Sequence, residues 1–569
     1  MNRLPRLLAI PLVLLLLIAV WFWWNLPEKV DMAAYVPADS LVYLELNSLT
    51  DVANSLINTD ASRQLGVYVG IKSDQRRDRL LTDWARVTGI ASTKSVIVAR
   101  SQAALVLLEI NPASSDTTLD LKPLTALVIE THTSSARIKP AIEQLLGDFA
   151  RRNFGQPVVE RVTNDQGEFL KWISPDGLRR IVLLIDGSTA IVGNDERAVS
   201  ACLAARRGQR PNLAHQPDVE DMRGRVRTND ALAFGYVSSA NAARLLAALT
   251  PAIFGQIPEE SQFQRLLAVS SAKVLGSIGW SARPFADGIE DLYFMTVKSV
   301  LIERLRPALR STVQPQHHAW SVLPSDTYSV TNYNFADPSA AWLALNGAVS
   351  SQLDTLAAIL FSTLSKASLA PYGIDEPETF LRAIKPEILT AKLDAASERS
   401  VVVAGIADEV TLRKLVSRQF GPKPRTEHIG DNELIISADE RSAASFNNGY
   451  FMLGSPEDLR HCLSGAKRAE QSLASQAGVT TYSTEAQDSP DVVTYTQDSE
   501  RVRALLTAVA RLRAPSSSVL SVDVEPLIKK LPYAVTETKL GDFGCERRTR
   551  SPLGQFTTLI SLLSSDTKK

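Results

Sequence analysis

The stretch V-P-A-D-S-L-V-Y-L-E-L-N, from Val36 to Asn47, predicts the organisation of the chain because a similar stretch occurs later. Residues Leu323 to Asn334 read L-P-S-D-T-Y-S-V-T-N-Y-N, so the two motifs lie 287 positions apart (324 − 37). In each motif a proline-led turn precedes residues with the period-two alternation of a β-strand. We therefore expect the motif to open two copies of one structural unit.

A second correspondence lies further along the chain. Gly193 and Glu196 match Gly454 and Glu457 at a spacing of 261 (454 − 193). Around both pairs the predicted order is strand, glycine, capped helix, polar loop, strand and helix. The same spacing also relates Asp230, Ser238 and Leu245 to Asp491, Ser499 and Leu506. Long matches in the same order indicate internal repetition.

The elements between the motifs predict an α+β fold. Apolar residues at helical spacing predict a helix over Ser134 to Phe149. Short apolar runs after it are separated by turn signals that begin at Asn164, Pro175 and Asp186, which is typical of an antiparallel meander. We expect two homologous repeats, each an antiparallel sheet with helices packed on one face. Their predicted limits are 31–303 and 321–569, with a linker at 304–320.

The first thirty residues predict the compartment. Arg3 and Arg6 precede an uncharged run from Leu7 to Trp24, which as a helix would rise about 27 Å, close to the roughly 30 Å of a hydrocarbon core. The run ends in aromatic side chains suited to the membrane interface: Trp21, Phe22, Trp23 and Trp24. Aromatic residues stand where a cleavable signal would carry small ones. We expect residues 1–30 to form an uncleaved signal anchor and tether, with the rest of the chain extracytoplasmic.

Composition excludes several classes of protein. The chain has 569 residues, 45% of them hydrophobic, which suits about two to four globular domains. The net charge is −1 and the basic residues are dispersed, which argues against nucleic-acid binding. Cys202, Cys462 and Cys545 lie far apart, so they predict neither a disulfide framework nor a zinc or redox pair.

The sequence predicts no catalytic, cofactor-binding or metal site. It contains no G-x-S-x-G, Walker, G-x-G-x-x-G or H-E-x-x-H motif. Asp39 and Asp326 recur in the two motifs, and we expect each carboxylate to hold its turn by binding nearby backbone. The predicted environment of Cys202 is a packed helix face. His317 and His318 stand in a predicted solvated linker without further metal ligands nearby.

One helical stretch is a candidate for binding. Residues Ala340 to Ser365 carry one charge and place large apolar side chains at steps of three and four. The candidate face consists of Trp342, Leu345, Val349, Leu353, Leu356 and Leu360. Such a stripe predicts either a helix packed on the sheet or a face that contacts lipid, an apolar ligand or a partner protein.

The Pro-Ala-Asp-Ser motif at Pro37 and the valine-glycine, capped-helix, leucine-alanine block from Ile191 to Ala214 resemble a family of bacterial membrane-anchored envelope proteins. That family is known only as a domain of unknown function, and the resemblance implies an extracytoplasmic location. We expect a noncatalytic binding or scaffold protein whose partners are the membrane and either envelope proteins or lipid. The alternatives are a carrier of lipid or another apolar ligand and, last, a hydrolase with a dispersed site.

Overall fold

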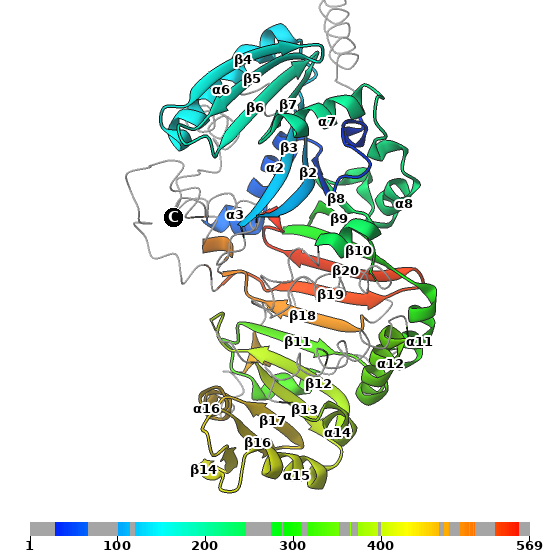
Figure 1. Ribbon diagram of the computed structural model, residues 1–569. Helices are drawn as coiled ribbons and strands as arrows, with labels where there is room; N and C mark the ends of the chain where they lie inside the picture. The colour runs from blue at the N-terminus through cyan, green and yellow to red at the C-terminus, as the bar shows by residue number, and fades with distance from the viewer. Residues whose placement is uncertain are drawn as a thin grey trace, which may run out of the picture.

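The structure is a computed structural model of the chain (Figure 1). It describes residues 29–65, 101–113, 120–245, 275–286, 288–309, 317–351, 374–396, 400–465, 472–476, 490–499 and 530–556, with positions 365, 479, 501–503, 506 and 528. Among these residues no helix is long and apolar enough to cross a membrane. The predicted anchor, with Trp21, Phe22, Trp23 and Trp24, lies outside the described residues.

The first half contributes ten strands to an antiparallel sheet. They are β1 (Val42–Leu46), β2 (Gln102–Ala113), β3 (Asp120–Glu130), β4 (Val158–Asn164), β5 (Gly167–Ile173), β6 (Arg180–Asp186), β7 (Thr189–Gly193), β8 (Ala233–Val237), β9 (Leu275–Phe285) and β10 (Gly288–Val297). Their order across the sheet is β4-β5-β6-β7-β3-β2-β1-β8-β9-β10.

The strands of the second half pair in a corresponding order. They are β11 (Ser329–Tyr333), β12 (Ile384–Lys392), β13 (Val401–Ile406), β14 (Arg425–Ile429), β15 (Asn432–Ile436), β16 (Ala443–Asn447), β17 (Tyr450–Gly454), β18 (Val492–Thr496), β19 (Ala534–Leu540) and β20 (Gly544–Ser551). Their order is β14-β15-β16-β17-β13-β12-β11-β18-β19-β20. Because β10 pairs with β20, the described strands form one 20-stranded sheet. It runs the length of the molecule, from β4–β7 at one end to β14–β17 at the other (Figure 1).

Helices surround this sheet. In the first half they are η1 (Met32–Tyr35), α2 (Leu49–Ile57), α3 (Asp60–Leu65), α6 (Ser135–Phe154), α7 (Glu196–Arg206), η3 (Leu213–His215), α8 (Pro217–Arg225), η4 (Thr228–Asp230) and α11 (Ser299–Leu309). In the second half they are η5 (His317–Val322), α12 (Pro338–Ser350), α14 (Pro377–Ala383), α15 (Glu409–Gln419), α16 (Pro456–Gly465) and η8 (Leu473–Ser475). Both ends of the predicted linker, 304–320, are therefore helical, since α11 reaches Leu309 and η5 begins at His317.

The helices cover both faces of the sheet, so the prediction of helices on one face was wrong. In β5, Phe169 packs in a core with α7, whereas the next residue, Leu170, packs in a separate core with α6. In β17, Phe451 packs with α15, and Met452 packs with α16. Successive side chains of a strand point to opposite faces. The physical reason is that these inner strands are apolar on both faces.

The matched asparagines of the two opening motifs make the same contacts. Asn47 Nδ2 donates to the Ala231 carbonyl at 2.7 Å, and Asn334 Nδ2 donates to the Pro490 carbonyl at 2.9 Å. Each asparagine also donates its backbone N–H to the carbonyl of the following residue of that segment, at 3.1 Å and 2.8 Å. Each motif is therefore tied to the segment that enters the neighbouring strand, β8 or β18.

The two motif aspartates do not hold their turns as predicted. In the first motif the Ser40 backbone N–H donates to the Pro37 carbonyl, which closes the turn through the backbone alone. The Asp39 carboxylate is exposed and pairs with Arg210 at 2.6 Å. Asp326 is likewise exposed and lies 3.4 Å from His461. These carboxylates link each turn to the chain beside it.

Candidate functional site

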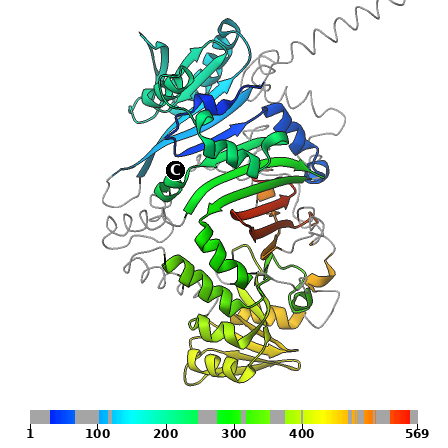
Figure 2. The ribbon, with the colours of Figure 1, turned by 90° about the vertical axis from the view of Figure 1, so that its right-hand side faces the viewer.

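The place where the two halves meet is the candidate site. Strands β9, β10, β20 and β19 lie side by side in the middle of the molecule, as the green and red strands of Figure 2 show. The register places Arg283 opposite Glu290, and Glu290 opposite Arg550. Directly opposed residues share a face of the sheet, so these three side chains form a row across three strands.

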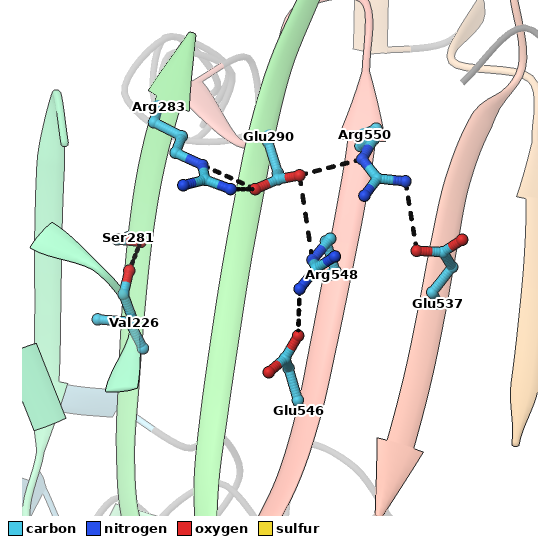
Figure 3. A network of polar contacts seen from close by, with 8 residues as sticks. All are labelled: Val226, Ser281, Arg283, Glu290, Glu537, Glu546, Arg548 and Arg550. Atoms are coloured by element: carbon cyan, nitrogen blue, oxygen red, sulfur yellow. Dashed lines mark hydrogen bonds and ion pairs between the residues drawn. The ribbon is translucent and has the colours of Figure 1, made fainter. Parts of the chain in front are cut away.

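Glu290 is the centre of this row, and only 1% of it is exposed. Arg283 Nε donates to Glu290 Oε1 at 2.8 Å, and Arg550 Nε donates to Glu290 Oε2 at 3.0 Å. The two carboxylate oxygens are thus bound from opposite sides, one from each half of the chain (Figure 3). A buried carboxylate needs such partners because water no longer solvates it.

The row continues into the second half. Arg550, itself buried, also donates from Nη1 to Glu537 Oε2 at 3.3 Å. Arg548 donates from Nη2 to Glu546 at 2.6 Å, and its Nε lies 4.0 Å from Glu290 (Figure 3). Burial raises the pKa of Glu537, although the neighbouring guanidinium groups oppose that shift. We call the six residues Arg283, Glu290, Glu537, Glu546, Arg548 and Arg550 the charged layer.

Contacts beside the charged layer tie other parts of the chain to it. The Arg550 guanidinium lies 4.9 Å from the centre of the Phe285 ring, a cation–π contact between β20 and β9. Phe285 in turn packs against the core of the second half. The Ser281 hydroxyl donates to the Val226 carbonyl, which fixes the chain after α8 to β9 (Figure 3).

A buried carboxylate also occupies the opposite face of β10. Trp280 Nε1 donates to Asp291 Oδ1 at 2.9 Å, and the Gln555 backbone N–H donates to Asp291 Oδ2 at 3.0 Å. Burial raises the pKa of Asp291 to about 7 despite these two bonds. Burial likewise raises the pKa of Asp498 to about 6, with Arg501 3.6 Å away. Asp291 therefore holds the segment that follows β20 against the first half.

The chemistry of these groups favours a structural role. The three carboxylates of the charged layer are bound by its three guanidinium groups, and both oxygens of Asp291 accept N–H bonds. Among the described residues, no three His, Cys, Asp or Glu side chains gather as a metal site. Cys202 and Cys462 are buried in the two cores, as the sequence predicts for Cys202, and burial raises the pKa of Cys202 to about 12.

The predicted candidate face falls partly on α12. This helix ends at Ser350, and its small residues Ala344 and Ala348 pack with α11. By helical geometry Trp342, Leu345 and Val349 lie around the other side, and Leu345 is 41% exposed. Leu353, Leu356 and Leu360 lie outside the described residues.

The sequence reasoning missed the charged layer. Strand β20 reads G-C-E-R-R-T-R-S from Gly544 to Ser551, which lacks the apolar alternation that predicts a strand. A signal was present in the sequence of β10, where Glu290 and Asp291 interrupt an otherwise largely apolar run. Charges at such positions indicate a partner of opposite charge on a neighbouring strand.

Comparisons with known proteins do not identify a function for the chain. No family model matches the chain, and no curated protein matches it. Among solved structures, the chain is similar to one described as "Structure of crystal form III of TP0453". The sequence identity is 10%, the match covers 50% of this chain and 90% of that one, and the TM-score is 0.24. A likeness at that level carries no argument about function.

Proposed function

We propose that the protein is a noncatalytic binding or scaffold protein, anchored in a bacterial inner membrane and extracytoplasmic in its bulk. We further propose that it consists of two repeats of one α+β unit. Support for the repeats comes from the corresponding strand orders of the two halves and from the equivalent bonds of Asn47 and Asn334. Support for the anchor comes from the uncharged run Leu7 to Trp24 and its basic flank.

The observation that carries the scaffold proposal is the position of Glu290 at the joint, the place where β10 of the first half pairs with β20 of the second. Its carboxylate is buried between Arg283 of the first half and Arg550 of the second. Separating the halves would expose a matched set of charges and break the ladder between β10 and β20. The joint therefore fixes the orientation of the two ends of the sheet, which is what a protein that positions partners requires.

A photo-crosslinking experiment on the full chain in its membrane tests this function. A benzophenone amino acid is placed at Val162 in β4 or at Thr426 in β14, the strands at the two ends of the sheet. A scaffold should give a reproducible crosslinked envelope protein at one end or both. Val410 on α15, also exposed, serves as the control position.

Enzymatic activity of the purified protein would contradict this proposal. If the purified full chain hydrolysed ester, peptide or glycan substrates, and substitutions in one cluster of residues abolished that activity, the noncatalytic proposal would be wrong. Loss of crosslinking at both ends without any activity would remove the scaffold proposal and leave the carrier described next.

A carrier of lipid or another apolar ligand is the second candidate, favoured by α12. Its alanines face α11, while Leu343 and Leu345 are exposed to solvent. Large apolar side chains on the outer side of a helix suit contact with an apolar ligand. Native mass spectrometry of the full chain released from detergent should then show a bound ligand, lost on Leu345→Gln; a mass equal to that of the chain alone would count against a carrier.

A further inference from the structure

One corner of the molecule gathers arginines around an exposed leucine. The register pairs Val158, at the start of β4, with Ile173, at the end of β5. The turn between β5 and β6 therefore lies at the same end of this layer as the start of β4. The end of α6 is also there, because it precedes β4 by a short connection through Gly155.

The turn between β5 and β6 is held firmly by its own hydrogen bonds. The Ser174 backbone N–H donates to the Arg179 carbonyl at 2.9 Å, and the Leu178 N–H donates to Asp176 Oδ1 at 3.0 Å. Gly177 adopts the left-handed conformation that the turn needs, with φ of +71°. Leu178 consequently projects outward and is 79% exposed, the largest value among the exposed large hydrophobic residues of the described chain.

Contacts between the turn and α6 bring Arg179 beside the end of that helix, where Arg151 and Arg152 lie. Arg179 Nη1 donates to the Asn153 carbonyl at 2.9 Å, and its guanidinium lies 5.1 Å from the centre of the Phe154 ring. The neighbouring Arg180 begins β6 at the same end of the layer, but its guanidinium lies on the face covered by α7, 4.0 Å from Asp195. We call Arg151, Arg152, Leu178, Arg179 and Arg180 the arginine corner.

The charge of the corner is positive. Its four guanidinium groups lie with three carboxylates, Asp148, Asp176 and Asp195, which leaves a net charge of +1 (4 − 3). Arg151 and Arg180 remain largely in water, with 66% and 50% of their side chains exposed. Val158 and Val159 add exposed apolar area beside them.

We propose that the arginine corner contacts the anionic phospholipid headgroups of the membrane in which the chain is anchored. This inference rests on the proposed anchoring. Guanidinium groups bind phosphate, and an apolar side chain at a projecting turn enters the headgroup region. The position supports lipid over an acidic protein, because η1, which follows the anchor and tether, lies at the same end of the molecule as β4–β7 (Figure 1).

A fluorescent label on the turn tests the contact in the full chain. Leu178→Cys is labelled with NBD in a Cys545→Ser background, since Cys202 and Cys462 are buried. The protein is reconstituted into bilayers of phosphatidylcholine alone or with phosphatidylglycerol, each with nitroxide-labelled lipid. We expect quenching of NBD that is stronger with phosphatidylglycerol and weakens with salt. Val410→Cys, on α15 at the other end of the molecule, is the labelled control and should show no dependence on phosphatidylglycerol.

Substitution of the arginines separates charge recognition from simple proximity. Each basic residue near an anionic surface changes a contact equilibrium about fivefold, so Arg151→Gln with Arg180→Gln should weaken the contact roughly 30-fold. Arg418→Gln with Arg425→Gln removes the same charge at side chains 68% and 56% exposed in the second half and should change nothing.

Three results would overturn the proposal: quenching equal in the two kinds of bilayer, quenching unaffected by the corner substitutions, or protection of the label by polyglutamate but not by phosphatidylglycerol. Flotation of the chain with bilayers at high salt reports the anchor separately. Failure to float would remove the proposed anchoring, whereas flotation without charge-dependent quenching would remove only the corner.

Discussion

Glu290 and Arg550 stand 260 positions apart in the sequence, yet their side chains meet across β10 and β20 with Nε 3.0 Å from Oε2. Both side chains are almost fully buried. A pair of this kind adds little net stability compared with apolar residues of the same shape, but it penalises any arrangement that leaves one charge alone. The pair therefore specifies how the halves join more than how tightly each half folds.

Removing one member of the pair should be costly. Arg550→Met leaves Glu290 buried with one close partner fewer, and we expect a loss of about 3 to 5 kcal/mol in the free energy of unfolding. Combining it with Glu290→Gln should restore part of that loss because position 290 then no longer carries a buried charge. Urea unfolding of the full chain in detergent, followed by tryptophan fluorescence, measures both. Glu409→Gln, which breaks an exposed pair with Arg413, is the control and should cost about 0.3 to 0.5 kcal/mol. Equal losses in the double and single variants would contradict the pairing.

The stability of the folded chain should depend on pH through Asp291. Burial raises its pKa to about 7 from the ordinary value of 3.8, so the folded state binds this proton more tightly than the unfolded state. Its contribution is complete below pH 4 and is lost as the pH rises through 7, amounting to roughly 4 kcal/mol for a shift of this size. Asp291→Asn, which stays neutral, should therefore flatten the fall in unfolding midpoint between pH 5 and pH 8. If the unfolding midpoint of Asp291→Asn falls with rising pH as steeply as that of the unchanged chain, other groups cause the pH dependence. Asp498 is then the first of these to test.

The two motif asparagines, Asn47 and Asn334, should contribute about equally to the free energy of unfolding. Asn47→Ala and Asn334→Ala each remove one side-chain hydrogen bond to a carbonyl, and each should cost about 1 kcal/mol of unfolding free energy. The two losses should add, because the sites share no partner. Asn153→Ala, whose Nδ2 donates to the Phe149 carbonyl on an exposed helix surface, should have a smaller effect. A large loss from one motif and none from the other would argue against equivalent roles.

The three cysteines should differ in reactivity. Burial raises the pKa of Cys202 to about 12 and also raises the pKa of Cys462, so neither forms a thiolate at neutral pH. Cys545 is only partly buried. In the native chain a disulfide reagent should modify Cys545 first, and the other two only at the rate of unfolding. Peptide mapping by mass spectrometry at successive times checks the order; early modification of Cys202 would contradict the packed core.

Local patterns predicted the β4–β7 layer and α6 well, because turn residues and helical spacing act over a few positions. The predicted helix over Ser134 to Phe149 corresponds to α6 at Ser135–Phe154. Strand β20 could not be predicted, since its charges are satisfied by β10 and β19, far away in sequence. On α12 the large side chains suggested the packing face, but Ala344 and Ala348 face α11 because small side chains allow close approach of two helices. Such outcomes depend on neighbours that a local pattern does not contain.

The antiparallel pairing of β10 with β20 also determines the relative direction of the two edge strands of the sheet, β4 and β14. In the described part of the chain the 20 strands stand in one row, and each pairing is antiparallel. An even number of alternating strands leaves β4 and β14 running in opposite directions. Each of these two edge strands has a neighbouring strand on one side only within the described sheet, so its other side is open to pairing with another chain. Charges at mid-strand, Glu160 and Arg161 in β4 and Glu427 in β14, are the features that oppose such pairing.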